Sequence, residues 1–388
     1  MALRQQNTFF TVVLLLGWLT WLGCKQTPDP HIDYVKTEDL PSLPQKLKQN
    51  DLPISDKKQP KNLTLALVGE VRGELEPCGC PTLPFGGFER RDTLLKRLRS
   101  DGPGPVFHVD AGDMLIKGFS TRRIDDVQGR AKEMLRMSQL VGVDAWVPGS
   151  SDLMAMSIDE MKKAEGPPKV SATWKEKTGE PVFPGSIVLE RDGVRVAVIG
   201  ISAKPPEKSG LIFESPRAAI ENELAKIPEN VDWIIGVGNI QEEEAQAIMS
   251  DGSLLSALFT TKGAVYSDPP ESNTRAPVIE MPDRGRYIQV VHARVATRPT
   301  EPLLLHPDKA EWRARLSAVR GGGTDGLSPI GDGRNLALIN TIPLSAELDQ
   351  AGPISDRLQK YQENRRQQAA KIAEKVGPHE KSYASSGT

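Results

Sequence analysis

Two cysteines separated by one residue, Cys78 and Cys80, form the most conspicuous reactive pair in this sequence. They lie in the stretch GELEPCGCPTLPFGGFERR, residues 73–91, just after a predicted strand. A disulfide between them would close a very small ring that is strained and easily reduced. Two thiolates are too few for a tetrahedral metal site, and their spacing is not the Cys-x-x-Cys of a redox motif. An oxidised pair that braces a turn is the favoured interpretation, with thiol exchange and metal binding as alternatives.

The elements that must position this pair follow an α/β pattern, because apolar runs alternate with helical periodicity from Leu63 onward. The predicted strands are Leu63–Val68, Val106–Asp110, Ala145–Val147, Val170–Ala172, Val194–Ile201, Trp233–Val237, Ala264–Val265, Val278–Met281 and Tyr287–Val295. The predicted helices are Phe88–Leu98, Asp125–Leu140, Pro216–Lys226, Gln241–Met249 and a polar helix at 354–376 whose apolar side is expected to pack on the domain.

Composition divides the chain into distinct parts. Residues 1–23 are predicted to be a lipoprotein signal peptide, and residues 24–61, rich in Pro, Lys, Asp and Gln, a disordered tether. Residues 62–300 are predicted to form one large domain. Residues 301–335 are a predicted loop region whose glycines match neither a dinucleotide fingerprint nor a phosphate loop. Residues 336–388 are expected to supply a strand, a helix and a disordered tail.

The first residues have the pattern of an export signal. Arg4 supplies positive charge before an apolar stretch at 9–22, which is short for a bilayer span and typical of a secretory signal. Gly23-Cys24 resembles a bacterial lipobox, so acylation of Cys24 is predicted, with an ordinary signal peptide as the alternative. Acyl chains contribute about 0.8 kcal/mol per buried methylene and would hold the protein on a membrane. Lys25, in place of Asp, favours the outer membrane.

The motifs after the tether carry a family resemblance. LALVGEVRGELEPCGC, GGFERRDTLLKRLR and VFHVDAGDML are followed by VDAWVPGSSDLM, KVSATW, GVRVAVIGIS and VDWIIGVGNIQEEEAQAI. This order resembles the start of the 5′-nucleotidase-like branch of the calcineurin-like metallophosphoesterases, specifically exported bacterial members with a Glu-Pro-Cys-Gly-Cys segment. The resemblance covers about residues 62–295. It implies a four-layer α/β/β/α sandwich, a two-metal site at the ends of central strands, and hydrolysis of phosphate esters.

Most ligand motifs that the resemblance implies are altered here. Where the family has Asp-x-His, this chain has Glu70 and Arg72, and Arg72 brings a permanent positive charge. Asp113 matches the carboxylate that bridges both metals. The Gly-Asn-His-Asp/Glu motif appears as Gly-Ser-Ser-Asp, and Asn239 stands where a later histidine is expected. The closing Gly-His-x-His should fall near LFTTKGAV, which offers Thr260, Thr261 and Lys262. The positions of this degenerate site are Glu70, Arg72, Asp113, Ser150, Ser151, Asp152 and Asn239.

Histidines are too few for the site that the resemblance implies. The chain has five, and only His108 and His292 lie inside predicted strands. His108 is expected to pack or to hydrogen-bond within its strand, whereas a site of this kind normally uses about four imidazoles. Two divalent cations would also be repelled by Arg72, so we expect Arg72 to take the place of a metal and to pair with Asp113.

The predicted helix at Phe88–Leu98 is strongly basic. Gly86-Gly87 precedes it, and the main-chain amides at its start could receive an anion. Its basic residues are expected to form a solvated face, with phosphate binding as the alternative; they are Arg90, Arg91, Lys96, Arg97 and Arg99.

The leading hypothesis is a non-catalytic, lipid-anchored envelope protein that binds a ligand or a protein partner, without a cofactor. The alternative is an active phosphoesterase that uses Mn, Zn, Fe or Mg, held by Glu70, Asp113 and Asp152. A weaker alternative is a thiol-redox accessory that uses Cys78 and Cys80. The expected partners are a membrane, an envelope protein and a phosphorylated small molecule. A net charge of −2 gives no electrostatic argument for nucleic acid.

Overall fold

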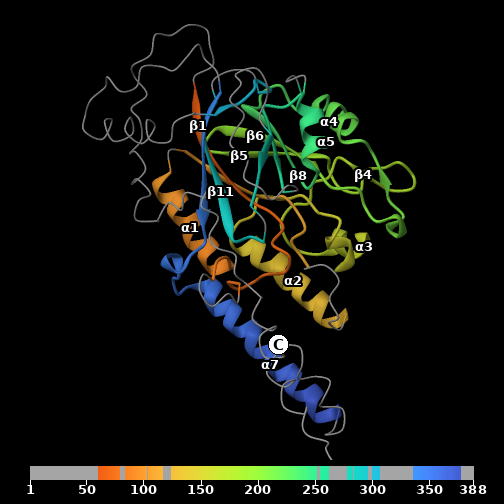
Figure 1. Cartoon of the computed structure of the whole chain (residues 1–388), viewed down its shortest axis with the longest axis vertical. Helices are drawn as coiled ribbons and strands as arrows, with labels where there is room; N and C mark the ends of the chain where they lie inside the picture. The colour runs from red at the N-terminus through yellow and green to blue at the C-terminus, as the bar shows by residue number, and fades with distance from the viewer. Residues whose placement is uncertain are drawn as a thin grey trace, which may run out of the picture. The chain divides into compact units, whose positions relative to one another are not determined.

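The structure is a computed structural model of the chain, drawn in Figure 1. It describes residues 60–78, 84–102, 104–116, 124–250, 254–261, 278–282, 284–295, 299–305 and 335–376. The signal peptide, Cys24 and almost all of the tether lie outside the described residues, as do Cys80, Lys262 and the predicted strand Ala264–Val265. Among the helices that are described, none combines the length and apolarity needed to cross a bilayer.

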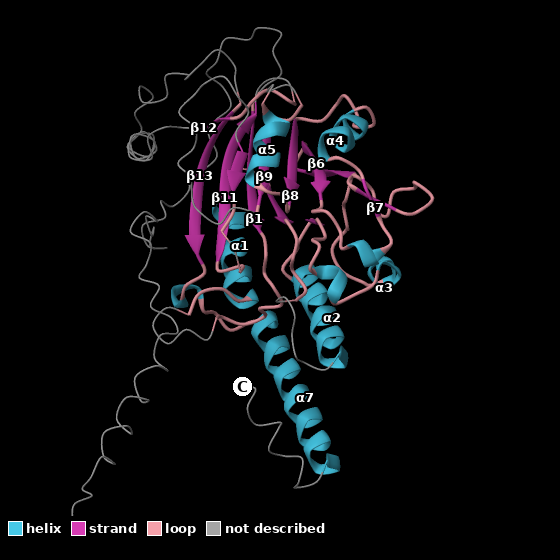
Figure 2. Ribbon diagram, turned by 45° about the vertical axis from the view of Figure 1, so that its right-hand side comes forward, coloured by secondary structure: helices cyan, strands magenta, loops and turns pink. Residues whose placement is uncertain are grey.

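The described strands form two large sheets, seen in Figures 1 and 2. The order in the first sheet is β12 (Leu304–Leu305), β13 (Leu336–Pro343), β11 (Tyr287–Val295), β1 (Lys61–Val68), β2 (Val106–Asp110) and β3 (Ala145–Trp146). The order in the second is β10 (Val278–Glu280), β9 (Ala257–Thr260), β8 (Trp233–Gly238), β6 (Val194–Ile201) and β5 (Ser186–Arg191). A small sheet pairs β4 (Trp174–Lys175) with β7 (Ile212–Phe213).

Helices cover the outer faces of both large sheets. The helices on the first sheet are α1 (Phe88–Asp101), α2 (Ile124–Leu140) and α7 (Pro353–Val376). Those on the second are α4 (Pro216–Leu224) and α5 (Glu242–Met249), and the short α3 (Ile158–Lys163) follows β3. One buried cluster lies between the first sheet and its helices, a second between the sheets, and a third under α4 and α5. These layers confirm the predicted α/β/β/α sandwich.

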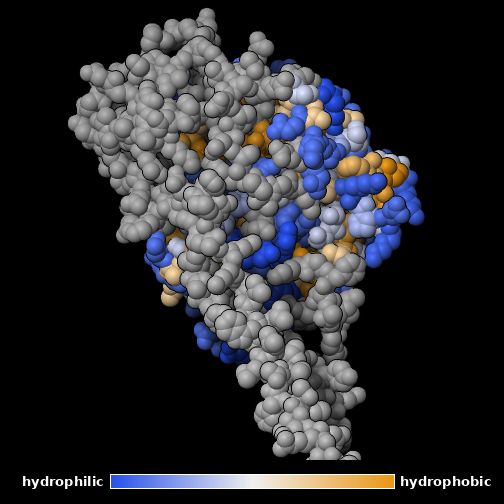
Figure 3. All heavy atoms as spheres, in the orientation of Figure 1, coloured by the Kyte–Doolittle hydropathy of each residue, from blue (hydrophilic) through white to orange (hydrophobic). Residues whose placement is uncertain are grey.

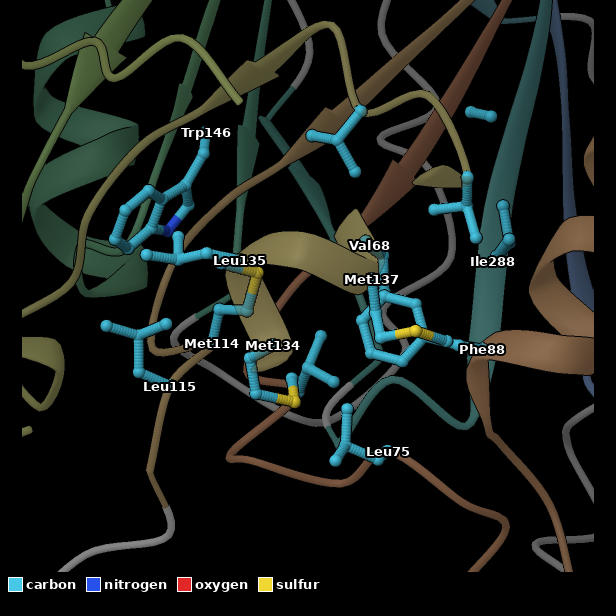
Figure 4. Packing of buried hydrophobic residues seen from close by; sticks show 14 of the residues in the cluster. Val68, Leu75, Phe88, Met114, Leu115, Met134, Leu135, Met137, Trp146 and Ile288 are labelled. Atoms are coloured by element: carbon cyan, nitrogen blue, oxygen red, sulfur yellow. The ribbon is translucent and has the colours of Figure 1, made fainter. Parts of the chain in front are cut away.

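Alternation along β1 explains why this segment becomes a central strand. Leu63, Leu65 and Leu67 face the second sheet, whereas Ala66 and Val68 face the helices. Because successive side chains of a strand point to opposite faces, the part of β1 at 63–68, which is apolar at every position except Thr64, must be covered on both sides. Figure 4 shows part of the helix-side cluster, with contributions from α1, α2 and β11.

The strand predicted at Val170–Ala172 is wrong. Val170 donates its main-chain N–H to Trp146 O of the first sheet at 2.9 Å, but Ala172 donates to Gly200 O of the second at 2.8 Å. The segment therefore passes from one sheet to the other, and no ladder forms on either. Its apolar residues are buried because it lies at the crossing, which a short apolar run does not distinguish from a strand.

The first sheet extends past the predicted domain boundary at residue 300. β13 pairs antiparallel with β11 along its whole length, and β12 is added parallel to β13. Strands β5 and β9 were also not predicted. The predicted packing of the C-terminal helix is confirmed, because Ile354 and Leu358 of α7 are buried in the helix-side cluster.

On the face drawn in Figure 3, the described residues that are visible are mostly hydrophilic, and hydrophobic ones form small separate areas. Among the described residues, the large apolar side chains that are exposed are Leu140 and Ile212, which lie on different elements. Isolated exposed apolar residues of this kind are ordinary on soluble domains.

Candidate functional site

The carboxyl ends of parallel strands from both sheets meet in one place. β1, β2 and β3 run parallel in the first sheet, and β6, β8 and β9 run parallel in the second. Asn239, just after β8, donates from Nδ2 to Glu70 Oε1, just after β1, at 3.5 Å. A Cβ on Gly69 would lie 2.0 Å from Thr261 Cγ2, so the two edges are in contact. Ligands of α/β sheets commonly bind at such carboxyl edges.

The turn after β1 is held in an unusual backbone conformation. Glu70 and Arg72 have φ values of 48° and 52°, in the left-handed region that non-glycine residues rarely occupy. Glu70 N donates to Gly112 O at 2.7 Å and Arg72 N donates to Asp113 O at 2.9 Å. Conformations of this kind cost about 1–3 kcal/mol each and concentrate at functional sites. The turn is therefore fixed by main-chain bonds to the loop after β2.

Glu70 and Arg72 form an ion pair within this turn. The Glu70 carboxylate is almost fully buried, and an Arg72 guanidinium N–H donates to its Oε2 atom. The Arg72 side chain keeps 33% of its surface exposed, so it lies at the rim of the site. The pairing of Arg72 with Asp113 that the sequence suggested stays a prediction; the described contact between these residues is the main-chain bond.

Asp113 is a buried acid on the turn after β2. It has a φ value of 50° and only 3% exposure. Its Oδ1 atom accepts the main-chain N–H of Ser151 at 2.8 Å. A Cβ at Gly149 would lie 2.2 Å from that same oxygen, so the loop after β3 can approach Asp113 because residue 149 is a glycine. Ser150 and Ser151 are half-buried beside this contact.

Asp152 supports the loop after β3 from within. Its two carboxylate oxygens accept the main-chain N–H groups of Leu115, at 2.7 Å, and Gly149, at 2.8 Å. Burial raises the pKa of this carboxyl well above its usual range, the nearby Asp113 carboxylate raises it further, and the two main-chain donors oppose that rise. Asp152 therefore ties the loop after β2 to the loop after β3.

The second sheet contributes neutral groups to the site. The Asn239 side chain donates from Nδ2 to Thr261 Oγ1 at 2.7 Å, and its Oδ1 atom is buried without a hydrogen-bond partner among the described residues. Thr260 donates its hydroxyl to Ile240 O at 2.6 Å. Ser202, directly after β6, the strand that pairs with β8, is also fully buried.

Asp110 and Arg91 lie behind the Asp113 turn. Asp110 is fully buried and its Oδ1 atom accepts the Gly112 N–H at 3.0 Å, while its Oδ2 atom lies 3.9 Å from Nη1 of Arg91. Burial raises the pKa of Asp110 to about 7 against the opposing effect of the Arg91 charge. Burial also lowers the pKa of Arg91 to about 10. The sequence analysis did not place Asp110 in the site, although it shares the Asp-Ala-Gly-Asp stretch with Asp113.

The predicted solvated face of α1 is wrong for two of its arginines. Arg90 and Arg91 are 4% and 1% exposed. Arg90 makes two hydrogen bonds to the Asp349 carboxylate, at 2.6 and 3.1 Å, and one to Leu344 O at 3.1 Å. Periodicity did not reveal this, because the acceptors come from a segment more than 250 residues away along the chain. Lys96 does lie on an exposed face, as expected.

The prediction for His108 as a strand residue is confirmed. Its ring is fully buried, and Nδ1 lies 2.9 Å from Ala66 O on the neighbouring strand. Burial and the nearby Arg91 charge lower the pKa of His108 to about 3, so the ring is neutral at ordinary pH.

Cys78 lies at the edge of the described part of the loop before α1. Its main-chain N–H donates to Phe85 O at 2.9 Å. Two residues earlier, Glu76 Oε1 accepts from Gln362 Nε2 of α7 at 2.8 Å. Because Cys80 lies outside the described residues, the disulfide, redox and metal alternatives for this pair all stay predictions.

The described acids do not fit a two-metal centre. In the residues that the structure covers, no group of three or more His, Cys, Asp or Glu side chains is placed to hold a metal ion. Both oxygens of Asp152 already accept main-chain N–H groups, and Glu70 accepts from a guanidinium. Second-sheet groups such as Asn239 and Thr261 are neutral and bonded to each other. A bimetallic site needs several anionic or imidazole donors aimed at one point.

Comparison with known proteins identifies the fold. No family model matches the sequence. Over 194 residues the chain is 25% identical to a 5′-nucleotidase of Vibrio vulnificus, an alignment that covers 46% of this chain and 34% of that protein. The chain thus spans about a third of the length of this curated relative.

Several solved structures resemble this one. The 5′-nucleotidase precursor of Thermus thermophilus has a TM-score of 0.54 and 15% identity, over 78% of this chain and 59% of that chain. The NAD nucleotidase of Haemophilus influenzae has a TM-score of 0.54 and 14% identity, over 79% and 61%. A calcineurin-like phosphoesterase of Bacillus subtilis has a TM-score of 0.53 and 14% identity, over 78% and 97%. With its two sheets and outer helices, the described chain has the fold of the 5′-nucleotidase-like, calcineurin-like phosphoesterases.

Proposed function

We propose that this chain is a non-catalytic protein with a phosphoesterase fold that binds a ligand or a protein partner at the bacterial cell envelope. The observation that carries the proposal is the ion pair between Arg72 and Glu70 at the carboxyl edge of β1. A guanidinium stays charged at every ordinary pH and has no lone pair to offer a metal ion. The Arg72 guanidinium would therefore repel a metal cation at the position where metal-dependent chemistry needs a ligand.

The charge balance of the described site supports this view. Two divalent cations a few ångströms apart repel one another and need several anionic ligands to offset that repulsion. Glu70 is paired with the Arg72 guanidinium, and both oxygens of Asp152 accept main-chain N–H groups. Oδ1 of Asp113 likewise accepts the Ser151 N–H, so the described carboxylates are engaged by protein groups and are not aimed together at one bimetallic centre.

The strained geometry of the turns supports a binding role. Glu70, Arg72 and Asp113 all have left-handed φ values, and backbone strain of this kind concentrates at sites that hold a ligand or a substrate. The Arg72 guanidinium is partly exposed, Ser150 and Ser151 are half-buried, and the main-chain N–H groups of Arg72 and Ser151 both donate to Asp113. Such groups suit a small phosphorylated molecule, while a protein partner of the envelope is the other candidate occupant.

The envelope location rests on the N-terminal sequence. We infer an exported protein that is held by acyl chains on Cys24 and faces the periplasm, with outer-membrane sorting favoured by Lys25. Replacing Cys24 with Ser should release the full chain into the soluble periplasmic fraction. Retention of the Cys24→Ser variant in the membrane fraction would contradict lipid anchoring.

Metal analysis of the purified full chain tests the loss of metal chemistry. We expect no stoichiometric Mn, Zn, Fe or Mg after exposure to each ion and removal of the excess. The matched variant carries Glu70→Asp together with Arg72→His, which restores the Asp-x-His pattern and should increase metal uptake. Two tightly bound ions in the unaltered chain would overturn the proposal.

An activity assay distinguishes the non-catalytic proposal from its main alternative, an active phosphoesterase. A generic phosphate diester and a nucleoside monophosphate should show no hydrolysis above the buffer rate, with or without added Mn. Hydrolysis that rises with Mn and disappears in Asp113→Ala would establish an active phosphoesterase with a divergent site.

A further inference from the structure

Four buried polar atoms lie beneath α1 without hydrogen-bond partners among the described residues. They are Nε and Nη1 of Arg91, Oδ2 of Asp110 and Nε2 of His108. These side chains are at most 1% exposed. Leaving one such atom unpaired in the interior costs about 1–3 kcal/mol, so a group of four calls for a partner that the protein atoms do not supply.

The four atoms belong to one face and one layer. His108 and Asp110 are two residues apart on β2, so their side chains point to the same side of the sheet. They pair in register with Ala66 and Val68, which belong to the cluster between the first sheet and its helices. Arg91 enters the same layer from α1, and its Nη1 atom lies 3.9 Å from Asp110 Oδ2.

Hydrogen-bonding roles at His108 follow from its neighbour. A carbonyl oxygen only accepts, so the 2.9 Å contact with Ala66 O requires the proton on Nδ1. Nε2 of the neutral ring is then an acceptor that needs a donor. In the ionised carboxylate Asp110 Oδ2 also accepts, whereas Arg91 only donates, and the guanidinium face of Arg91 is covered by the Phe88 ring at 4.4 Å.

We propose that the space between Arg91, Asp110 and His108 binds an internal water molecule. The water accepts a hydrogen bond from Arg91 Nη1 and donates its two protons to Asp110 Oδ2 and His108 Nε2, which gives a partner to three of the four atoms. Two bonds of ordinary length, about 2.8 Å, span the 3.9 Å gap between Arg91 and Asp110 when the water lies to one side of it. Three polar partners are typical of a buried water in a folded protein.

The same network makes Arg91 a positioning residue for the candidate site. Asp110 uses its other oxygen to hold the Gly112 N–H at 3.0 Å. Gly112 leads directly into Asp113, whose main-chain and side-chain oxygens hold Arg72 N and Ser151 N. Arg91 thus acts through the water and Asp110 on the turn that carries Asp113. This inference does not depend on whether the site is catalytic.

A crystal structure of the full chain at a resolution that shows ordered waters tests the site directly. We expect density within hydrogen-bond distance of Arg91, Asp110 Oδ2 and His108 Nε2. A direct bond between Arg91 and Asp110 with no water density beside them would overturn the proposal.

Hydrogen exchange of the full chain tests the positioning role. Arg91→Met should make the Gly112 amide exchange about tenfold faster. The Asp110 carboxylate would lose both the guanidinium charge and the bound water that orient it toward this amide. The matched control is Arg97→Met, the same change at a half-exposed position of α1, which should leave this amide unaltered. Unchanged exchange in a folded Arg91→Met chain would refute the role. If that variant does not fold, Arg91→Lys keeps the charge, and it should still raise the exchange rate because an ammonium lacks the guanidinium fork.

Discussion

The two sheets end in chemically different ways where they meet. After β1 and β2 the chain turns through left-handed residues, namely Glu70, Arg72 and Asp113, and brings charged groups together. After β8 and β9 it continues without such turns among the described residues and presents neutral groups, Asn239 and Thr261, which bond to each other at 2.7 Å.

The difference arises because burying a charged carboxylate costs more free energy than burying a neutral amide or hydroxyl. A buried carboxylate needs several donors, and here main-chain N–H groups supply them, as at Asp152. The loops of the first sheet must therefore curl to aim their amides inward. An amide and a hydroxyl satisfy one another across neighbouring strands, so the second sheet needs no special backbone. We expect the charged half to respond more strongly to substitution and to pH.

Asp152→Ala should have the largest effect. The substitution leaves the N–H groups of Leu115 and Gly149 buried without acceptors, at a cost of about 1–3 kcal/mol each. We expect the free energy of unfolding in urea to fall by about 3 kcal/mol. Asp152→Asn is the matched control, since it keeps one carbonyl acceptor and should lose less. Equal losses in the two variants would mean that the main-chain bonds do not carry the stability.

His108 should contribute less to stability in acid than at neutral pH. His108 has a pKa of about 3 when folded and about 6.5 when unfolded, so the unfolded chain binds the extra proton between these values. Its contribution is complete above pH 6.5 and declines as the pH falls, by about 2 kcal/mol at pH 5. Asp110, with its raised pKa of about 7, acts in the opposite direction, because its contribution is lost as pH rises toward 7.

Substitutions at His108 and Asn239 test whether the pH dependence belongs to the charged half of the molecule. The unfolding free energy of His108→Gln relative to the unaltered chain should be more favourable at pH 5 than at pH 7.5, because the glutamine does not titrate. The same comparison for Asn239→Ala should not depend on pH. A pH-dependent difference at Asn239 would remove the distinction between the two halves.

Asn239→Ala should have a moderate effect. The variant loses the 2.7 Å bond to Thr261 and the longer contact with Glu70, but it also removes the unpaired Oδ1 atom. These terms oppose one another, so we expect a loss of about 1–2 kcal/mol in thermal or urea unfolding. A loss as large as that of Asp152→Ala would show that the second sheet contributes equally.

Of the four substituted positions, Thr260 should show the smallest effect, in the variant Thr260→Val. The valine keeps the shape and removes the hydroxyl that donates to Ile240 O at 2.6 Å. One carbonyl then loses a partner, which costs about 1 kcal/mol. Thr260→Ser, which keeps the hydroxyl, is the control and should retain the bond. A valine variant as stable as the unaltered chain would show that this bond is neutral.

Local pattern was sufficient for the central strands. β2, β6 and β11 have the predicted bounds, because uninterrupted apolar runs bounded by turns leave little choice of element. The segment at Val170–Ala172 shows the limit, since its hydrogen bonds go to two different sheets. Candidate residues such as Glu70, Asp113, Asp152 and Asn239 were found from motif order, and the structure brings them to one edge.

The sequence by itself determined the four-layer class and the residues that end the central strands, because apolar alternation and motif order are local properties of the chain. Only the tertiary structure decided the partners: Arg72 with Glu70, Arg90 with Asp349, and Arg91 behind Asp110. A charged side chain buried in α1 looks in sequence like one on a solvated face. Its position depends on acceptors that approach from distant segments, and the balance of burial cost and ion pairing is set only when those segments pack together.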